Sequence, residues 1–162
     1  MRRAAASRPV LGICGGFQML ARMIADPDGV ENSGTVDGLG LLPVDVVFHR
    51  DKVLARREGR WRGEAVSGYE IHHGRAECGP GDEEFLDGVR VGSVWATMWH
   101  GSLESDGFRR AWLREVARQA GRVWSPSDDG VGFAAAREAM IETIADAIER
   151  HVEVDELLSL AR

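Results

Sequence analysis

The sequence lacks the features that define several large classes of protein. It contains two cysteines in 162 residues, Cys14 and Cys78, which have no CxxC spacing and make no disulfide framework. No apolar run approaches the roughly 20 residues that a membrane-spanning helix needs. The net charge of -6 at pH 7 and the isoelectric point near 5.4 argue against a nucleic-acid or anionic-membrane surface. These absences predict a reduced, cytoplasmic protein with no nucleic-acid and no membrane partner.

Patterns for a cofactor or a metal are also missing. There is no phosphate-binding loop of the Gly-x-x-x-x-Gly-Lys type, so we expect no bound ATP in this chain. His72 and His73 are neighbours on a predicted strand and therefore point to opposite faces of it. His49 and His151 have no neighbours at the spacing of metal ligands. We therefore predict that this chain holds no cofactor and no metal.

One stretch near the start combines a strand, a cysteine and a helix. The apolar run 10–13 predicts a buried strand, and apolar residues at helical spacing predict a helix over 17–24. Cys14 lies between them, flanked by glycines that tolerate the positive φ or backbone crowding of a sharp turn. This order predicts a nucleophile elbow, in which the helix N-terminus favours the thiolate and its N–H groups hold an oxyanion. The alternative is a cysteine that is merely a small buried hydrophobic residue.

The remaining chain predicts further strands and helices in alternation. Strands are expected over 41–48, 65–73 and 89–99, the last with a break at Gly92. Loops are expected over 31–38, 78–88 and 123–132. The charged segment 50–63 fits a hairpin or an exposed loop, and a solvated connection is the preferred interpretation. Helices are expected over 106–121, 133–151 and 155–160. The pattern predicts an α/β fold.

Several blocks resemble a known family. The sequence GICGGFQML at 12–20 is similar to the elbow of class I glutamine amidotransferases. A narrower resemblance, to the cobyric acid synthase family, covers nearly the whole chain and rests on blocks in the family's order: DPDGVE at 26–31, GLGLLP at 38–43, GYEIH at 68–72, WHG at 99–101 and DGFRR at 106–110. A sister family, cobyrinate a,c-diamide synthase, usually has an acidic residue before the cysteine, where this sequence has Ile13.

The resemblance implies a three-layer, flavodoxin-like α/β fold of the class I amidotransferase type. In that family further strands precede the elbow strand, and one of their loops supplies a second oxyanion N–H. Only residues 1–9 precede it here, so we expect 1–162 to be a partial amidotransferase domain that lacks its first strands. The ATP-dependent synthetase domain, with its Mg-ATP, is expected outside this chain. The chain alone is therefore expected to be weakly active or inactive.

The resemblance also implies which residues do the chemistry. Cys14 is the nucleophile, and His100, at the end of the predicted strand 94–99, is the base. The alternative for His100 is a core histidine beside Trp99. Many class I amidotransferases have an acid two residues after this histidine, where this sequence has Ser102. The third catalytic residue is therefore unassigned, with Glu104 and Asp106 as the candidates.

Three residues are implied to bind the substrate. The N–H of Gly15 would hold the oxyanion, and Gln18 would contact bound glutamine, with an exposed helix residue as the alternative. Tyr69, in the block that also holds Glu70 and His72, would form the rim of the glutamine pocket.

The implied partners are glutamine and, through the synthetase domain, a corrinoid. Cys14 would form a thioester with glutamine, and the released ammonia would amidate adenosylcobyrinic acid a,c-diamide at positions b, d, e and g in cobalamin biosynthesis. Three alternatives stay open: the glutaminase subunit of another amidating ligase of the cell-wall type, a γ-glutamyl hydrolase, and a catalytically silent interaction module.

Overall fold

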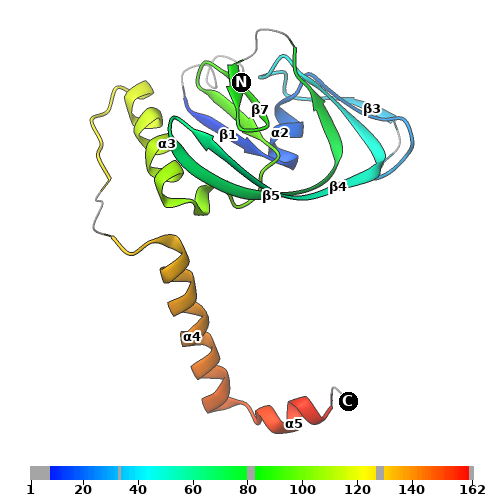
Figure 1. Cartoon of the computed structure of the whole chain (residues 1–162). Helices are drawn as coiled ribbons and strands as arrows, with labels where there is room; N and C mark the ends of the chain where they lie inside the picture. The colour runs from blue at the N-terminus through cyan, green and yellow to red at the C-terminus, as the bar shows by residue number, and fades with distance from the viewer. Residues whose placement is uncertain (1–7, 33, 80–82, 127–129, 161–162) are drawn as a thin grey trace. The chain divides into compact units, whose positions relative to one another are not determined.

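The computed structural model in Figure 1 describes residues 8–32, 34–79, 83–126 and 130–160. Contacts between residues divide the chain into two compact units, Met1–Pro126 and Ser127–Arg162. Each unit is described by itself. All the strands and the candidate catalytic residues belong to the first unit.

A first sheet carries the elbow strand. Its order is β1 (Val10–Ile13), β8 (Val94–Thr97), β7 (Gly88–Val91) and β6 (Glu83–Phe85). β1 and β8 are parallel, with Val10 opposite Val94 and Ile13 opposite Thr97, whereas the other pairs are antiparallel. Because neighbouring parallel strands end at the same edge of a sheet, whatever follows β1 and β8 lies close together.

A second mixed sheet has the order β3 (Gly34–Asp37), β2 (Met23–Asp26), β4 (Asp45–Trp61) and β5 (Glu64–Glu77). β2 and β4 are parallel, and the other pairs are antiparallel. β4 and β5 form a long hairpin that curves across the first unit (Figure 1), with a register shift between Phe48 and Val53. Such an irregularity bends a strand, so one hairpin can contact several elements.

Helices cover the first sheet on both faces. α2 (Gly15–Leu20) packs into a core shared by the two sheets, while α3 (Asp106–Gln119), which follows the short helix η1 (Ser102–Glu104), packs into a second core. The strand β8 is buried along its whole length because alternate side chains enter different cores. Ala96 belongs to the first core, and Trp95 belongs to the second, where it meets Trp112 edge-to-face at 5.9 Å.

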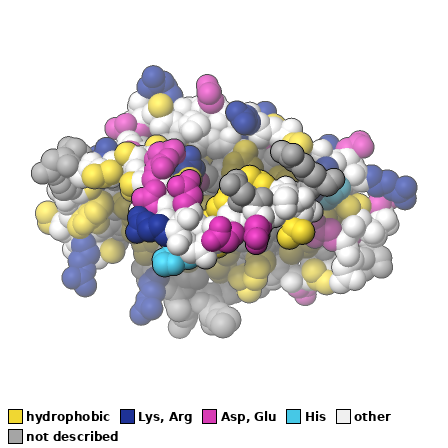
Figure 2. All heavy atoms as spheres, turned by 90° about the horizontal axis from the view of Figure 1, so that it is seen from below, with side chains coloured by type: hydrophobic (Ala, Val, Ile, Leu, Met, Phe, Trp, Pro, Cys, Tyr) yellow, Lys and Arg dark blue, Asp and Glu magenta, His cyan; other side chains and the backbone are white. Residues whose placement is uncertain are grey.

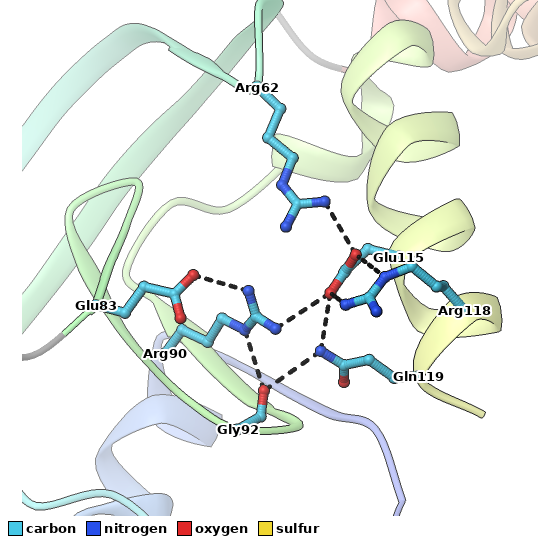
Figure 3. Close-up of polar contacts among 7 residues, drawn as sticks. All are labelled: Arg62, Glu83, Arg90, Gly92, Glu115, Arg118 and Gln119. Carbon is cyan, nitrogen blue, oxygen red and sulfur yellow. Dashed lines mark hydrogen bonds and ion pairs between the residues drawn. The ribbon is translucent and has the colours of Figure 1, made fainter. Parts of the chain in front are cut away.

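A buried carboxylate on α3 ties this helix to two hairpins (Figure 3). Glu115 is only 2% exposed, and it accepts hydrogen bonds from Arg62 at 2.9 Å, Arg90 at 3.1 Å and Arg118 at 2.7 and 2.9 Å. Gln119 donates a further bond at 2.9 Å. The guanidinium groups, Arg118 first, lower the pKa of Glu115 to about 2, against the opposing effect of burial.

The second unit contains α4 (Phe133–His151) and α5 (Val154–Ser159). None of the residues of α4 is buried within the described chain, although an apolar stripe runs along it. The exposed apolar residues of this stripe are Met140, Ile141, Ile144 and Ile148. Apolar side chains interspersed with acidic and basic ones are visible on the surface in Figure 2. The described helices include none that is long and apolar enough to cross a membrane.

Much of the expected α/β pattern is confirmed. The strand over 65–73 lies within β5, the segment 89–99 forms β7 and β8 with Gly92 between them, and α3, α4 and α5 lie where helices were predicted. The loops expected over 31–38 and 78–88 are wrong in part, since they contain β3 and β6. Residues 33 and 80–82 of these loops, and 127–129 of the loop 123–132, lie outside the described residues.

The helix predicted over 17–24 is wrong beyond Leu20. Met23 and Ile24 lie in β2, where they pair with β4. The following segment ends the helix, because the N–H groups of residues 39–42 donate to the carbonyls of Met19, Leu20 and Ala21 at 2.8 to 3.0 Å. For the same reason the strand expected over 41–48 begins only at Asp45.

The preferred interpretation of 50–63 as a solvated connection is also wrong. This segment is the second half of β4 and the turn into β5, so the hairpin alternative is the correct one. The alternation is hard to recognise in this charged segment, because none of the residues 50–61 is buried and the buried residues of this part of the hairpin, Val66 and Glu70, lie on β5.

Candidate active site

Cys14 follows the last residue of β1 and precedes the first residue of α2. Its backbone angles are φ 50° and ψ -111°, a conformation that is costly for a residue other than glycine. The Cys14 N–H donates to the Thr97 carbonyl at 2.9 Å, and the Cys14 carbonyl accepts the N–H of Gln18 at 3.0 Å. This is the strained strand-to-helix turn of a nucleophile elbow.

The glycines around Cys14 have different tasks. A Cβ on Gly12 would lie 2.6 Å from the Leu20 side chain and 2.9 Å from the backbone of Gly16, so the close approach of α2 requires glycine there. A Cβ on Gly15 or Gly16 would meet nothing within 4 Å. Of the residues 12–16, the positive φ falls on Cys14 and not on a glycine. The structure therefore confirms the crowding and assigns the strain to the cysteine.

The thiol of Cys14 is half-buried, and its pKa is raised. Burial is the main cause, the N–H of Gly15 opposes it, and the negative charge of Glu31 adds to it. We expected the helix N-terminus to favour the thiolate, and this expectation is wrong. The helix α2 has only six residues, and burial raises the pKa of the thiol more than the N–H of Gly15 lowers it. A nucleophile of this kind needs a base to remove its proton.

His100 lies three residues beyond the end of β8, at the sheet edge where β1 also ends. Its backbone pairs with Tyr69 of β5, through N–H groups that donate at 2.8 and 3.0 Å. The two rings are stacked, with centroids 5.0 Å apart and an angle of 13° between the planes. The Nε2 atom of His100 is buried without a hydrogen-bond partner in the described residues. A buried ring nitrogen without a partner is unusual, and it makes His100 a candidate for proton transfer.

The candidates for a third catalytic residue differ in their surroundings. The carboxylate of Asp106 pairs with Arg109, whereas that of Glu104 lies beside Gly101, where a Cβ would be 3.5 Å from its Oε1. Ser102 is buried, and its Oγ has no hydrogen-bond partner in the described part of the chain. Of the two acids, Glu104 is thus the one whose carboxylate adjoins the residue next to His100.

Comparison with known proteins assigns the family. Residues 1–108 match the family described as the CobB/CobQ-like glutamine amidotransferase domain. This chain belongs to that family. The family has the class I glutamine amidotransferase-like fold, and the two mixed sheets with their helices agree with it.

Two relatives of this CobB/CobQ-like chain are named cobyric acid synthase. The chain is 58% identical over 163 residues to the cobyric acid synthase of Cutibacterium acnes, a match that covers 99% of this chain and 34% of the relative. It is 56% identical over 162 residues to that of Mycolicibacterium gilvum, covering 99% and 32%. The chain therefore spans about a third of the length of the curated relatives it matches. The prediction that 1–162 is a partial domain stays a prediction.

The implied substrate-binding residues of this CobB/CobQ-like domain lie around the elbow. Gly15 is exposed, and its N–H acts to lower the pKa of the Cys14 thiol. Tyr69 is half-exposed against His100. The side chain of Gln18 extends from α2 to β5, since a Cβ on Gly74 of β5 would lie 2.7 Å from the Nε2 of Gln18. Gln18 is thus partly buried and turned to the second sheet.

Two acidic residues near the elbow were missed by the sequence. Glu31 is close enough to raise the pKa of Cys14, and its loop is fixed by Asp26, which accepts N–H bonds from Glu31 at 2.9 Å, Val30 at 2.8 Å and Asn32 at 2.9 Å. Asp87 lies in the turn between β6 and β7, and it binds the end of β8. No local pattern distinguishes Asp87 from an ordinary turn residue.

No metal site is found in the described chain: no group of three or more histidine, cysteine, aspartate and glutamate residues could hold an ion there. The buried carboxylate Glu70 is instead paired with Arg57 at 2.5 Å and lies 3.6 Å from the Nε2 of His72. The absence of a cofactor from this chain stays a prediction.

Proposed function

We propose that this chain is the glutaminase part of a cobyric acid synthase, with Cys14 as nucleophile and His100 as acid and base. The thiol gives its proton to His100 while the sulfur attacks the side-chain amide carbon of glutamine. The N–H of Gly15 holds the tetrahedral oxyanion. His100 then protonates the amide nitrogen, the C–N bond breaks, and ammonia leaves a glutamyl thioester. Water, deprotonated by His100, cleaves the thioester to glutamate.

The observation that carries this proposal is the arrangement of two parallel strands. Cys14 is held in a strained conformation at the end of β1 by a hydrogen bond to Thr97, and the strand of Thr97 leads directly to His100. The membership in the amidotransferase family supports the same roles. A structural cysteine would gain nothing from a backbone conformation of this cost.

The charges around the elbow fit glutamine as the substrate. Glu31 places a negative charge close to Cys14, where it would attract the α-ammonium group of an amino acid. The half-exposed ring of Tyr69 beside His100 offers a surface for the aliphatic part of the side chain.

The fate of the ammonia is a further part of the proposal. The curated relatives are about three times as long as this chain and are named cobyric acid synthase. We expect their remaining length to bind Mg-ATP and to amidate adenosylcobyrinic acid a,c-diamide at positions b, d, e and g with the ammonia released here. The partners of this chain are then glutamine and, through the synthetase part, the corrinoid.

A chimera tests the proposal. The matched third of the Cutibacterium acnes cobyric acid synthase is replaced by this chain, to which it is 58% identical. We expect the chimera to amidate the corrinoid with glutamine as nitrogen donor. Cys14→Ser should abolish the use of glutamine and keep the use of added ammonia, because hydrolysis and ligation use different parts of the protein. Cys78→Ser, which changes the exposed cysteine, should keep both.

Two results would contradict it. If Cys14→Ser loses amidation with ammonia as well, Cys14 is structural and the interaction-module alternative gains support. If the isolated chain hydrolyses γ-glutamyl peptides in preference to glutamine, the γ-glutamyl hydrolase alternative is correct.

A further inference from the structure

The residues 98–100 that follow β8 make backbone hydrogen bonds to two side chains and to one residue of β5. The N–H of Met98 donates to both carboxyl oxygens of Asp87, at 3.1 and 3.3 Å. The N–H of Trp99 donates to Oγ1 of Thr97 at 3.1 Å, and the N–H of His100 donates to the carbonyl of Tyr69 at 2.8 Å. Asp87 thus fixes the start of the segment that carries the candidate base.

Thr97 links this segment to the elbow. Its carbonyl accepts the N–H of Cys14 at 2.9 Å, and its hydroxyl donates to Oδ1 of Asp87 at 2.5 Å. Thr97 is fully buried, so its own carbonyl and hydroxyl are shielded from water, although Asp87 is exposed. A change at Asp87 therefore reaches Cys14 and His100 through the same residue.

Glu70 closes the arrangement from the other side. It follows Tyr69, whose backbone pairs with His100, and its carboxyl group lies close enough to that of Asp87 to raise the pKa of Asp87. Glu70 is 5% exposed, and its other contacts are Arg57 on β4 at 2.5 Å and the Nε2 of His72 at 3.6 Å. The two carboxyl groups therefore connect the end of β8 with the part of β5 that holds His100.

The turn that carries Asp87 is itself fixed. Leu86 has φ 58°, and a Cβ on the next glycine, Gly88, would lie 2.2 Å from the carbonyl oxygen of Ala96 on β8. Because the hairpin turn is in such close contact with β8, Asp87 cannot move away without moving the strand.

We propose that Asp87 and Glu70 are positioning residues, which hold the segment 97–100 so that His100 faces the Cys14 elbow. This inference rests on the proposed roles of Cys14 and His100. Neither carboxyl group is assigned a contact with the substrate, and both act through Thr97, Tyr69 and the backbone that joins them.

The surroundings of Asp87 favour its protonated form more than water does. The pKa of Asp87 is raised, first by desolvation of its carboxyl group, although the residue as a whole is exposed, and further by Glu70, while Thr97 and Met98 oppose this. The charged or titratable groups that face the pair are Arg57 and His72.

Asparagine at position 87 reproduces the protonated state. Its amide oxygen can accept from Thr97 and Met98, and its NH₂ group can donate to Glu70. Alanine provides neither. The informative variants are therefore Asp87→Asn and Asp87→Ala, with Glu84→Gln, an exposed carboxylate of the same hairpin, as matched control.

The experiment measures alkylation of Cys14 in the full chain by a glutamine analogue that has a diazoketone in place of the amide. Peptide mass spectrometry gives the rate at Cys14, with the exposed Cys78 as reference in the same molecule. We expect Asp87→Ala to lower the Cys14 rate at least about tenfold, since it removes two hydrogen bonds from the segment. Asp87→Asn should stay within about twofold of the unchanged chain, and so should Glu84→Gln.

The role of His100 separates positioning from general stability. In a His100→Gln background, Asp87→Ala should have little further effect, because the group that it positions is already missing. A second readout is pH: Asp87 loses its proton as the pH rises through its raised pKa, whereas asparagine does not titrate, so the rate ratio of Asp87→Asn to the unchanged chain should rise with pH. If Asp87→Ala does not fold, the pH dependence of this rate ratio tests the positioning role by itself.

Different failures have different meanings. If His100→Gln leaves the Cys14 rate unchanged, the proposed function fails. If His100→Gln lowers the rate but Asp87→Ala does not, or if Asp87→Asn falls as far as Asp87→Ala, the proposed function stands and the positioning role is overturned. A rate ratio that stays constant with pH would overturn the role given to the Asp87 proton.

Discussion

Glu115 and Asp87 both bind several groups through their carboxyl oxygens, but their surroundings differ in charge. Glu115 is in contact with three arginines, which lower its pKa to about 2. Asp87 faces a second carboxyl group, and its pKa is raised. Neighbouring guanidinium groups favour the charged form of a carboxyl group, which can then link several elements through ion pairs. A neighbouring carboxyl group favours the protonated form instead.

Their positions follow the same division. The Glu115 cluster connects α3 with the β4–β5 turn and with β7, and the seven residues of Figure 3 include neither Cys14 nor His100. Asp87 is bonded to Thr97, the residue that holds the N–H of Cys14. Acids with a perturbed pKa occur preferentially at functional sites, although structural ion pairs also perturb pKa values. The comparison therefore predicts that changes at one site affect catalysis and that changes at the other affect stability.

The largest expected effect is on the catalytic side. His100→Gln keeps the size of the side chain but cannot accept the thiol proton, so glutamate release by the chimera should fall about 10²–10⁴-fold. The thermal midpoint should change little, since Nε2 of His100 has no partner to lose within the described residues. His151→Gln, at an exposed histidine of α4, is the control. Activity that survives His100→Gln would remove His100 from the mechanism.

The next effect is on the stability side. Glu115→Ala leaves three guanidinium groups around an empty position, one of them the largely buried Arg90, and should lower the free energy of unfolding by about 3–5 kcal/mol in urea titrations. Glu115→Gln should cost less, because the amide still accepts hydrogen bonds. Glu142→Ala on α4, where the side chain is exposed, should change almost nothing. A small effect of Glu115→Ala would show that the cluster does not stabilise the fold.

The two sites should also respond oppositely to pH. The pKa of Glu115 is lowered from its usual 4.5 to about 2, which corresponds to roughly 3 kcal/mol. This stability is present above about pH 4.5 and is lost as the pH falls towards 2. The contribution of Asp87 has the opposite sign: it is full at low pH and is lost as the pH rises through the raised pKa.

Urea titrations between about pH 2 and 7 measure this. Glu115→Gln should remove most of the loss of stability on the acid side, and Asp87→Asn should leave that loss as it is. An acid-side loss that is equally large in Glu115→Gln would assign it to other carboxylates.

The smallest expected effect distinguishes the arginines of the Glu115 cluster. The side chain of Arg90 is 11% exposed, and it also binds Glu83, so Arg90→Ala should lower the free energy of unfolding by about 1–3 kcal/mol. The side chain of Arg118 is 69% exposed, so Arg118→Ala should cost clearly less. Equal losses of unfolding free energy in the two variants would mean that the exposure of the arginine does not determine how much each ion pair stabilises the fold.

Local patterns were sufficient for part of the molecule. The helix α4 begins and ends where its periodicity predicts, and the break between β7 and β8 coincides with Gly92, which has φ 58°. The order of strand, cysteine and helix predicted the elbow, and the sequence blocks between residues 12 and 110 predicted the family. In each case the decisive information lies within a few residues of the chain, because helix periodicity, turn glycines and sequence motifs are local.

Other features were decided by residues far apart in the sequence. Met23 and Ile24 have helical spacing but lie in a strand, because β4 begins some 20 residues later and pairs with them. Glu115 is buried because Arg62 and Arg90 reach it from 53 and 25 residues away. The raised pKa of Asp87 depends on Glu70 of another strand, and the raised pKa of Cys14 depends on burial. The sequence by itself determined the elbow, its cysteine and the histidine that follows β8. Only the tertiary structure decided which carboxyl groups have a raised pKa and which a lowered one, because desolvation and pairing depend on neighbours in space.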